Sequence, residues 1–552
     1  MSTKCFHFGS FLALSFLALV FTSGVNIGYG FFTAKWLLLY GIAAFSCAWL
    51  IGKNTLPIPD WNRKELFLFG LVFIAAIGNT IWLSPSGFEN SLLDRCSFFV
   101  LAYFIYVAFE RKLFSWDTLL WPVIIGCAST AVYGLWQISG ETIGANFPYT
   151  KVGSLFGYSN NAAQFIGLCI VYLGFRKGLS LWPKFALWTS CVLGLVYVVL
   201  SQCRSVYLGL ILVAVFSVLR LVRKRTQIFK ALATTALVFF IAVAVQSSRE
   251  GSFTLYQPKE LLTSFRVEMA KSTLHMIRER PLGVGVDAYE FKALPFIKKH
   301  TPDLLNEDFL AKSPHNELLR YPAEDGVPAS LLFLLLILYL GYRWWAEFRR
   351  KENPEDNFVF AFLLFYSAEA VAQFPFQNPL PFFIFSFCLA WLVFRTSRST
   401  ELSAAIYRPV LVVIFLVQMS CGYLVTYSRL YEKSNDLETV KQACSYLPSN
   451  WHACLLEAKL EMQQEKVQEA RVTLENLLRI QPDNLIAMRN LSLVAFHDGK
   501  VFQRRLEGCY YLWRYVDGYD GRTALTEPLK HNCPERWIDY FNRKHPSTFF
   551  NR

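Results

Sequence analysis

The chain has 552 residues, of which 54% are hydrophobic, 16% are aromatic and only 17% are charged. Soluble proteins carry about 25% charged residues, so this composition excludes a typical soluble domain and indicates a membrane protein with many spans. The net charge of +13 lies mainly in short loops between apolar runs. This distribution argues against a nucleic-acid-binding surface and is typical of loops that orient a membrane protein. The thirteen cysteines include no Cys-x-x-Cys pair of the kind that binds a metal.

About twenty consecutive apolar residues cross a bilayer as a helix. The first such run covers residues 8–26, and we expect it to be retained as a signal anchor because a second run follows almost at once. The expected spans are 8–26, 31–51, 66–83, 95–110, 118–138, 160–175, 184–201, 204–221, 229–246, 327–344, 358–374, 379–395 and 409–427. The predicted fold is therefore all-α: a polytopic membrane protein with about thirteen transmembrane helices, followed by a soluble helical-repeat domain.

Lysine and arginine are distributed unevenly between the two sides of the predicted membrane region. They are concentrated in the loops on the side of the N-terminus, whereas the short loops of the opposite side hold only Arg95, Lys151 and Arg204. The positive-inside rule then places the N-terminus in the cytoplasm, and an odd number of spans places the large loop and the tail outside. The expected regions are N-terminal transmembrane helices (1–246), a large periplasmic loop (247–326), C-terminal transmembrane helices (327–427) and a periplasmic tail (428–552).

The tail contains an internal repeat. Residues 447–453 (LPSNWHA) recur as residues 481–487 (QPDNLIA), so that proline, asparagine and alanine return after 34 residues, the period of tetratricopeptide repeats. Two copies fall short of the three that a stable solenoid needs, so residues 501–552 are expected to supply a cap. Such repeats serve either as a docking surface for a partner or substrate, or as a scaffold without a ligand. Outside the cytoplasm the cysteines of the tail can form disulfides, in a pairing that the sequence leaves open: Cys444, Cys454, Cys509 and Cys533.

Several polar residues are expected on the same outer face. Asn160 and Asn161 stand at the mouth of the sixth span, where carboxamides either cap the helix or bind sugar hydroxyls. Arg204 stands between two apolar runs, where a charge is costly unless it snorkels, pairs or lines a polar cavity. Glu369 lies within the eleventh span and is a functional candidate with an arginine as partner, and Gln373 follows it at the outer face.

The large loop supplies a second arginine and a histidine. Met269 and Met276 belong to an apolar pattern that predicts an amphipathic helix lying on the membrane, with Arg266 near its start. Residues 281–285 (PLGVG) predict a tight turn that returns the chain towards His315. A lone histidine of this kind is more simply explained as part of a solvated loop, so its interpretation depends on the other residues of the same face.

Two arginines, a histidine and nearby carboxamides on one face have a clear chemical use. Guanidinium groups bind phosphate oxygens bidentately, so Arg204 and Arg266 can hold a diphosphate and stabilise its charge as it leaves. His315 can take the proton of an attacking hydroxyl, and we predict that Glu324 orients it. The loop holds no Asp-x-Asp motif for a divalent metal, so the arginines would replace the cation. The glycan is expected to bind to Asn160, Asn161, Asn316 and Gln373.

These motifs resemble the O-antigen ligase family, whose superfamily also contains O-antigen polymerases and the O-linking oligosaccharyltransferases of pilins. The ligase signature is histidine, Asn/Ser/Gln, nine residues, glycine, two residues and Gly/Thr/Tyr. It matches His315, Asn316 and Gly326 and departs from the pattern at Ala329. The resemblance covers about residues 140–395, and its other matching elements are Gly157 to Asn161, Arg204 in Ser201 to Ser205, and Arg266 ahead of Pro281 to Gly285.

The resemblance implies a GT-C-like transferase of the bacterial inner membrane that uses an undecaprenyl-diphosphate-linked glycan, without a metal or another cofactor. In such proteins the matching histidine is taken as the base and the arginines as ligands of the donor diphosphate. The acceptor is lipid A–core for the ligases, another lipid-linked glycan for the polymerases and a protein serine for the oligosaccharyltransferases. The expected partners are thus the donor, one of these acceptors, the lipid bilayer and a protein on the C-terminal repeats.

Two other classes of protein would share some of these features with a transferase. A lipid-linked glycan flippase or another transporter would also have many spans and buried arginines. Transporters, however, place charge near the bilayer midplane and often show duplicated halves, whereas the polar groups here gather at one face. A structural assembly protein whose repeats recruit partners would need neither His315 nor both arginines.

Overall fold

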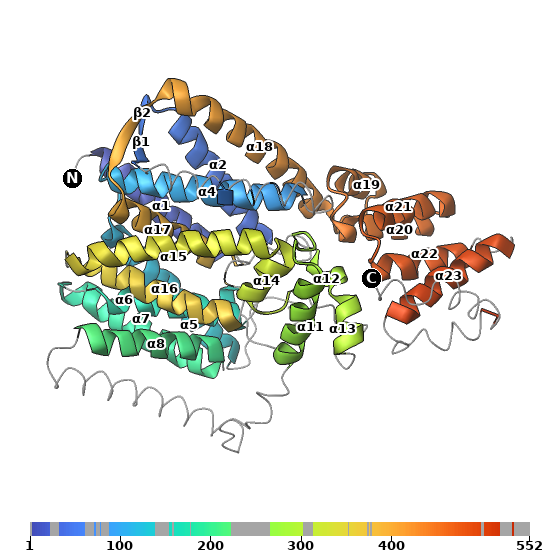
Figure 1. Cartoon of the computed structure of the whole chain (residues 1–552), viewed down its shortest axis with the longest axis horizontal. Helices are drawn as coiled ribbons and strands as arrows, with labels where there is room; N and C mark the ends of the chain where they lie inside the picture. Colours follow the sequence, from blue (N-terminus) through green and yellow to red (C-terminus); the bar gives the residue numbers. More distant parts are fainter. Residues whose placement is uncertain are drawn as a thin grey trace, which may run out of the picture.

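The structure is a computed structural model of the whole chain. The residues that it describes are 3–22, 33–60, 71–72, 75, 78, 88–138, 154–156, 159–176, 178–201, 203–221, 265–286, 288–301, 313–350, 353–372, 375, 378–497, 502–518 and 533–534. They form three parts: a bundle of long helices, a group of short helices at one end of it, and a C-terminal group of helices beyond these (Figure 1).

The long helices of the bundle run side by side (Figure 1). They are α1 (Thr3–Phe21), α2 (Thr33–Ile51), α4 (Phe88–Glu110), α5 (Leu120–Ile138), α6 (Ser159–Gly174), α7 (Leu181–Leu200), α8 (Arg204–Leu221), α15 (Val327–Arg350), α16 (Pro354–Ala372), α17 (Pro379–Thr396) and α18 (Ala404–Tyr431). Short 3-10 turns, η2 (Trp116–Leu119) and η3 (Ser154–Phe156), precede α5 and α6. A helix satisfies its own backbone hydrogen bonds, which is why apolar runs adopt this form in a membrane.

Seven helices among the described residues are long and apolar enough to cross a membrane. These and the remaining long helices coincide with eleven of the expected spans. The other two, 66–83 and 229–246, lie largely or wholly outside the described residues, so the expected number of thirteen stays a prediction. The protein is a largely helical, multi-pass membrane protein.

A two-stranded sheet departs from the all-α expectation. Strand β1 (Thr55–Pro59) pairs antiparallel with β2 (Ser399–Ser403), at the end of the bundle away from the C-terminal helices (Figure 1). Each strand has five residues and connects two spans, so neither carries the length of alternating pattern by which a strand is predicted.

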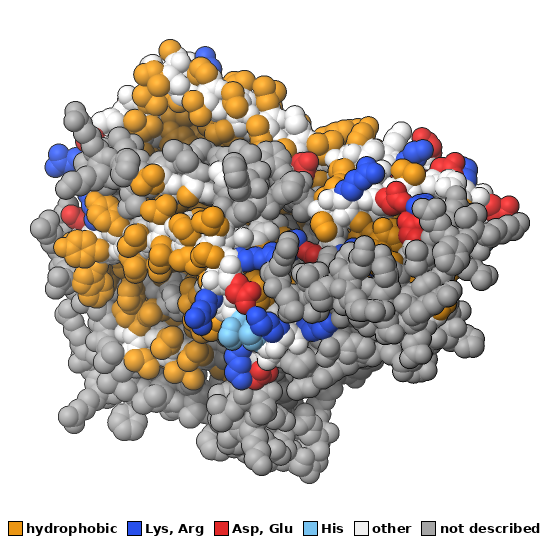
Figure 2. Space-filling model, turned by 45° about the vertical axis from the view of Figure 1, so that its right-hand side comes forward, with side chains coloured by type: hydrophobic (Ala, Val, Ile, Leu, Met, Phe, Trp, Pro, Cys, Tyr) orange, Lys and Arg blue, Asp and Glu red, His pale blue; other side chains and the backbone are white. Residues whose placement is uncertain are grey.

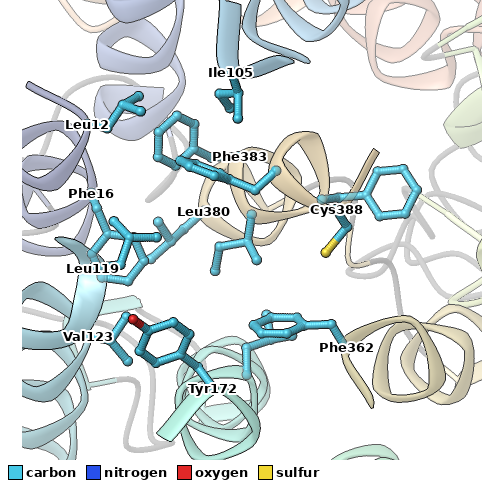
Figure 3. Packing of buried hydrophobic residues seen from close by; sticks show 14 of the residues in the cluster. Leu12, Phe16, Ile105, Leu119, Val123, Tyr172, Phe362, Leu380, Phe383 and Cys388 are labelled. Carbon is cyan, nitrogen blue, oxygen red and sulfur yellow. The ribbon is translucent and has the colours of Figure 1, made fainter. Parts of the chain in front are cut away.

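Helix α17 lies in the middle of the bundle and is apolar on all sides, as a central helix must be. Leu380 and Phe383 of α17 lie among side chains from α1, α4, α5, α6 and α16 (Figure 3). Asn378 begins this helix by accepting a hydrogen bond from the backbone N–H of Leu380 at 3.3 Å, and Pro379 occupies the first helical position. Close side-chain packing of this kind holds helices together in a membrane, where water exclusion supplies little driving force.

Four short helices form the described part of the large loop: α11 (Phe265–Glu279), α12 (Tyr289–Lys292), α13 (Leu294–His300) and α14 (Glu317–Glu324). They lie between the bundle and the C-terminal helices (Figure 1). Charged and histidine side chains gather in this region, whereas broad hydrophobic surfaces cover the bundle (Figure 2).

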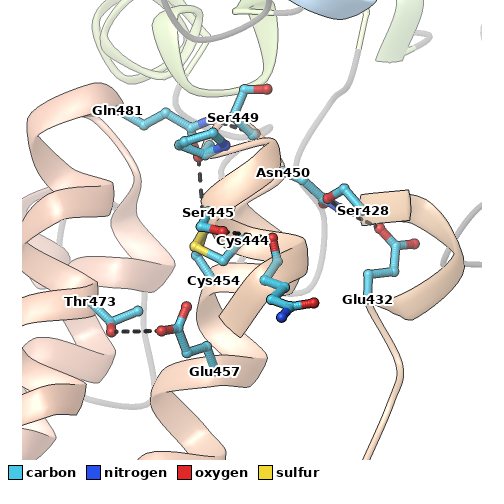
Figure 4. The surroundings of a disulfide bond; sticks show 12 residues. Ser428, Glu432, Cys444, Ser445, Ser449, Asn450, Cys454, Glu457, Thr473 and Gln481 are labelled. Carbon is cyan, nitrogen blue, oxygen red and sulfur yellow. Dashed lines mark hydrogen bonds between the residues drawn. A yellow bond between two sulfur atoms is a disulfide. The ribbon is translucent and has the colours of Figure 1, made fainter. Parts of the chain in front are cut away.

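The tail consists of α19 (Leu437–Tyr446), α20 (Trp451–Gln463), α21 (Val467–Ile480), α22 (Leu485–His497) and α23 (Phe502–Gly518). Two disulfides, Cys444–Cys454 and Cys509–Cys533, give the pairing that the sequence left open. Figure 4 shows the first of them, beside a hydrogen bond from Gln481 to the carbonyl oxygen of Ser449 that joins the two repeated segments. The tetratricopeptide assignment itself is not tested by this arrangement.

The tail packs directly on the loop helices. Met269 and Met276 of α11 are fully buried in a hydrophobic cluster that also contains Leu512 and Trp513 of α23 and the Cys509–Cys533 disulfide. The expected helix is therefore present, but the prediction that its apolar face lies on the membrane is wrong, because that face packs on protein. An apolar stripe has the same sequence period whether lipid or protein covers it.

Candidate active site

Helices α6, α8, α11 and α14 all begin in one region. The starts of α6 and α8 are in contact, since Cys203 Sγ lies 4.0 Å from the carbonyl oxygen of Asn160. The charge of Arg266, the second residue of α11, acts on Cys203 just before α8 and on His315 just before α14. The first turn of a helix has unpaired N–H groups and a partial positive charge, so a place where four helices begin favours an anion.

Arg266 is the charged side chain that links these segments. Its side chain is half-buried, and within the described part of the chain its guanidinium has no hydrogen-bond acceptor. Burial and the Glu369 carboxylate raise the pKa of the Cys203 thiol to about 11, and the Arg266 charge opposes this rise. A guanidinium with unused donors beside helix N-termini can bind phosphate oxygens in the bidentate manner.

His315 is held in an unusual conformation at this place. Its φ of +52° is uncommon for a residue other than glycine and marks a local constraint of the kind found at functional sites. The backbone N–H of His315 donates to Ser313 Oγ at 3.4 Å, and Asn316 caps α14 by accepting from the N–H of Leu319 at 3.2 Å. Burial, together with the Arg266 charge, lowers the pKa of His315 to about 4. The imidazole is therefore neutral at ordinary pH and able to accept a proton.

Two glycines bring α11 and α14 together. The turn after α11 docks on the end of α14, where the N–H of Val284 donates to the carbonyl of Ala323 at 2.9 Å and the N–H of Val327 to that of Pro281 at 2.8 Å. A Cβ on Gly283 would lie 2.4 Å from the carbonyl oxygen of Glu324, and both Gly283 and Gly326 have positive φ. The glycines of the two sequence motifs thus permit the backbone contact that fixes Arg266 relative to His315.

The structure places the other predicted residues as follows. Arg204 is the first residue of α8, and only its backbone is described. Asn160 and Asn161 lie in the first turn of α6, and Asn161 is buried. Gln373 lies outside the described residues, so its expected role stays a prediction, as does glycan binding by the asparagines.

Glu324 and Asn316 have clear structural partners. Glu324 is buried on α14 and accepts a hydrogen bond from Arg320 Nε at 3.0 Å, and Arg320 also contacts Glu317 at 3.4 Å. This ion pair holds α14 together at helical spacing. The predicted role of Glu324 as the partner that orients His315 stays a prediction.

Glu369 lies near these helix starts, in the last turn of α16. Its side chain is fully buried, and its Oε2 accepts hydrogen bonds from Gln164 Nε2 of α6 at 3.1 Å and from Ser205 Oγ of α8 at 3.2 Å. Sequence reasoning named Glu369 but missed both donors. The signal for Gln164 was its spacing of one helical turn from Asn160 and Asn161, and Ser205 directly follows Arg204.

A separate cavity of about 1110 Å³ runs along α14, α15 and α16. Its walls are mainly apolar, with contributions from α4 and α17 such as Phe98 and Phe385. At its polar end, Arg95 forms an ion pair with Asp325, the residue that follows α14. Arg266, His315 and Glu369 do not line this cavity, whose volume and apolar walls suit an apolar chain.

The arrangement combines an anion site with a neutral base. Positive groups, namely the helix starts and Arg266, can stabilise negative charge on a leaving group, and His315 can take a proton within reach of the same arginine. Within the described residues, no three His, Cys, Asp or Glu side chains form a group that would hold a metal ion.

A comparison of the sequence with curated proteins finds no match. The sequence model of the O-antigen ligase family matches residues 189–334. The matched segment runs from α7 to α15 and contains Arg204, Arg266 and His315 together with the two glycines of the turn contact. This match supports the O-antigen ligase family, and with it a membrane glycosyltransferase that acts on a lipid-linked glycan.

Proposed function

We propose that this protein transfers a glycan from an undecaprenyl-diphosphate-linked donor to an acceptor hydroxyl, without a metal, at the periplasmic face of the bacterial inner membrane. The observation that carries the proposal is the meeting of four helix N-termini with Arg266 and His315 in one place. Negative charge is favoured there, and the base stands beside the arginine. The family match supports the reaction class.

In the proposed reaction, His315 takes the proton of the acceptor hydroxyl while the hydroxyl oxygen attacks the anomeric carbon of the donor glycan. The bond between that carbon and the diphosphate oxygen breaks, and the diphosphate leaves with the electron pair. Arg266 and Arg204 offset the charge that grows on the diphosphate. The bound diphosphate in turn offsets the Arg266 charge, which makes protonation of His315 more favourable in the complex than in the empty site.

The outward placement of the loop and tail is supported by two features. The Lys and Arg residues of the loops are concentrated on the opposite side. The tail contains two disulfides, and disulfides form and persist in an oxidising compartment such as the periplasm. The loop helices lie at the end of the bundle nearer the tail, so both would share the periplasmic side (Figure 1).

The lipid part of a substrate would lie in the apolar cavity beside α14. The charged side chains at its polar end already have partners, since Arg95 pairs with Asp325 and Arg320 with Glu324. A diphosphate would therefore bind on the side of Arg266, and the cavity would take hydrocarbon. The acceptor would be lipid A–core, another lipid-linked glycan or a protein serine, and the helices α19–α23 would act as a tetratricopeptide-like surface that supports the loop and meets a partner.

The test supplies the purified protein with an undecaprenyl-diphosphate glycan and each of the three acceptors in separate reactions. His315→Ala is expected to lower transfer by about 10²–10⁴-fold, the usual contribution of a general base. Arg266→Ala is expected to lower it by about 10²–10³-fold, as for the loss of a group that stabilises transition-state charge. His275→Ala and Arg278→Ala, on the same helix α11, are the matched controls and should retain transfer. Full transfer by the His315 and Arg266 variants, at normal protein levels, would refute the proposal.

A further inference from the structure

Glu369 places a buried carboxylate in a site that favours anions, so its position requires a physical explanation. Glu369 has no exposed surface, lies in a membrane helix, and stands near helix starts and Arg266, which would otherwise suit a diphosphate. Burial of a charge without a partner is costly, and charged residues inside membrane helices therefore tend to be paired.

The packing below Glu369 fixes its position. Phe365, one turn earlier on α16, fits against two glycines: a Cβ on Gly167 of α6 would lie 2.5 Å from its ring, and one on Gly209 of α8 would lie 2.7 Å away. Small residues let membrane helices approach closely. This contact brings α16 close to α6 and α8. One turn further along α16, Gln164 of α6 and Ser205 of α8 therefore donate hydrogen bonds to one oxygen of Glu369.

The other carboxylate oxygen of Glu369, Oε1, is buried and accepts no hydrogen bond from the described residues. The Arg266 guanidinium has no acceptor among the same residues, and the two charges attract each other. A carboxylate with one oxygen fixed and one available, within electrostatic reach of an arginine with unused donors, is suited to hold that arginine in place.

We propose that Glu369 is the counter-charge of Arg266 and a positioning residue for the donor diphosphate. It keeps the guanidinium on the donor side of the site and balances its charge when no donor is bound. The donor then meets an arginine that is already placed, so less ordering is needed on binding. This inference rests on the proposed function and adds a residue that acts through Arg266 rather than on the reacting atoms.

The experiment is a double-mutant cycle on Glu369→Gln and Arg266→Ala, with donor KM and kcat measured separately. Glu369→Gln is expected to raise the donor KM about tenfold with little change in kcat, a loss typical of groups that orient a ligand-binding residue. In the Arg266→Ala background, Glu369→Gln should cause no further loss, because the residue through which it acts is absent. Glu369→Asp, which keeps the charge, should recover part of the KM change.

Two further variants distinguish a specific effect on donor binding from a general loss of folding. Ser205→Ala removes one donor to Glu369 and should raise the donor KM in the same direction by a smaller factor. Asp356→Asn, at the other end of α16, breaks an ion pair with Arg395 of 2.8 Å and serves as the control: any loss that it causes should add to that of Arg266→Ala.

Each outcome has a defined meaning. Additive losses of Glu369→Gln and Arg266→Ala would overturn the inference, because the carboxylate would then act independently of the arginine. An unchanged donor KM, or a lower one, would also overturn it, the latter because the carboxylate would merely repel the donor. If Arg266→Ala and His315→Ala themselves retain transfer, the proposed function fails, which is a different result from additivity in the cycle.

Discussion

Gly326→Ala is predicted to displace α14 and with it His315. Gly326 has a φ of +86°, a region that costs a residue with a side chain about 1–2 kcal/mol. The new Cβ would also lie 2.4 Å from the carbonyl oxygen of Leu282. Because this neighbour is a backbone atom, no side-chain rotation relieves the contact, and the turn after α11 must move away from α14.

The size of the effect follows from the contacts that such a movement breaks. Two of the hydrogen bonds that hold the turn to the end of α14 and the start of α15 run from Val327 to Pro281, at 2.8 Å, and from Val284 to Ala323, at 2.9 Å. Each contributes about 1 kcal/mol, so with the backbone strain the variant should be destabilised by about 3–4 kcal/mol. Glycan transfer should fall at the same time, because the position of Arg266 relative to His315 is no longer fixed.

The assay compares thermal unfolding in detergent and glycan transfer for Gly326→Ala and a control, Gly422→Ala. Gly422 lies in α18, away from the cavity, and a Cβ there would meet no atom within 4 Å. The control should unfold at or slightly above the wild-type temperature, since alanine favours a helix over glycine by about 1 kcal/mol. A Gly326→Ala protein with wild-type stability and full transfer would refute the reasoning about the turn contact.

The remaining predictions concern pH, the cavity and the tail. Since the pKa of His315 is about 4 and its neutral form accepts the proton, kcat/KM of the Glu369→Gln variant, in which the buried carboxylate no longer titrates, should rise with pH through about 4 and stay level above about pH 5.5; a midpoint near 6.5 would contradict this. Ser367→Trp, at an exposed position on the cavity wall, should lower transfer, whereas Leu416→Trp on the exposed face of α18 should not. Opening the Cys509–Cys533 disulfide by serine substitution should destabilise the tail by about 3 kcal/mol and also lower transfer, because this disulfide belongs to the hydrophobic cluster that contains Met269 and Met276 of α11. Opening the Cys444–Cys454 disulfide, which lies outside that cluster, should lower stability with transfer retained.

Hydrophobic runs were enough to predict most of the bundle, because a run of about twenty apolar residues has few alternatives to a membrane helix. The contact between α11 and α14 could not be predicted from hydrophobic runs. Arg266 and His315 are far apart in the sequence, and a backbone contact between Gly283 and Gly326 brings their helices together. Glycine marks a turn in the sequence but does not show which backbone segment it will meet.

Two other features depend on partners that a local pattern does not show. Met269 and Met276 predicted an amphipathic helix correctly, but the same stripe suits a membrane surface and a neighbouring domain equally well. Glu369 stood out as a charge in an apolar run, whereas its partners Gln164 and Ser205 come from two other helices. Their meeting depends on the position of Phe365 against Gly167 and Gly209.

The central claim is that His315 acts on the acceptor while Arg266 holds the donor diphosphate. Its most direct test measures the affinity for undecaprenyl diphosphate and the rate of glycan transfer on the same preparations of wild type, His315→Ala and Arg266→Ala. The account predicts that the His315 variant binds undecaprenyl diphosphate as tightly as wild type but has lost transfer, and that the Arg266 variant binds it more weakly. Equal affinity of all three proteins, or an unimpaired transfer rate in the His315 variant, would contradict the account.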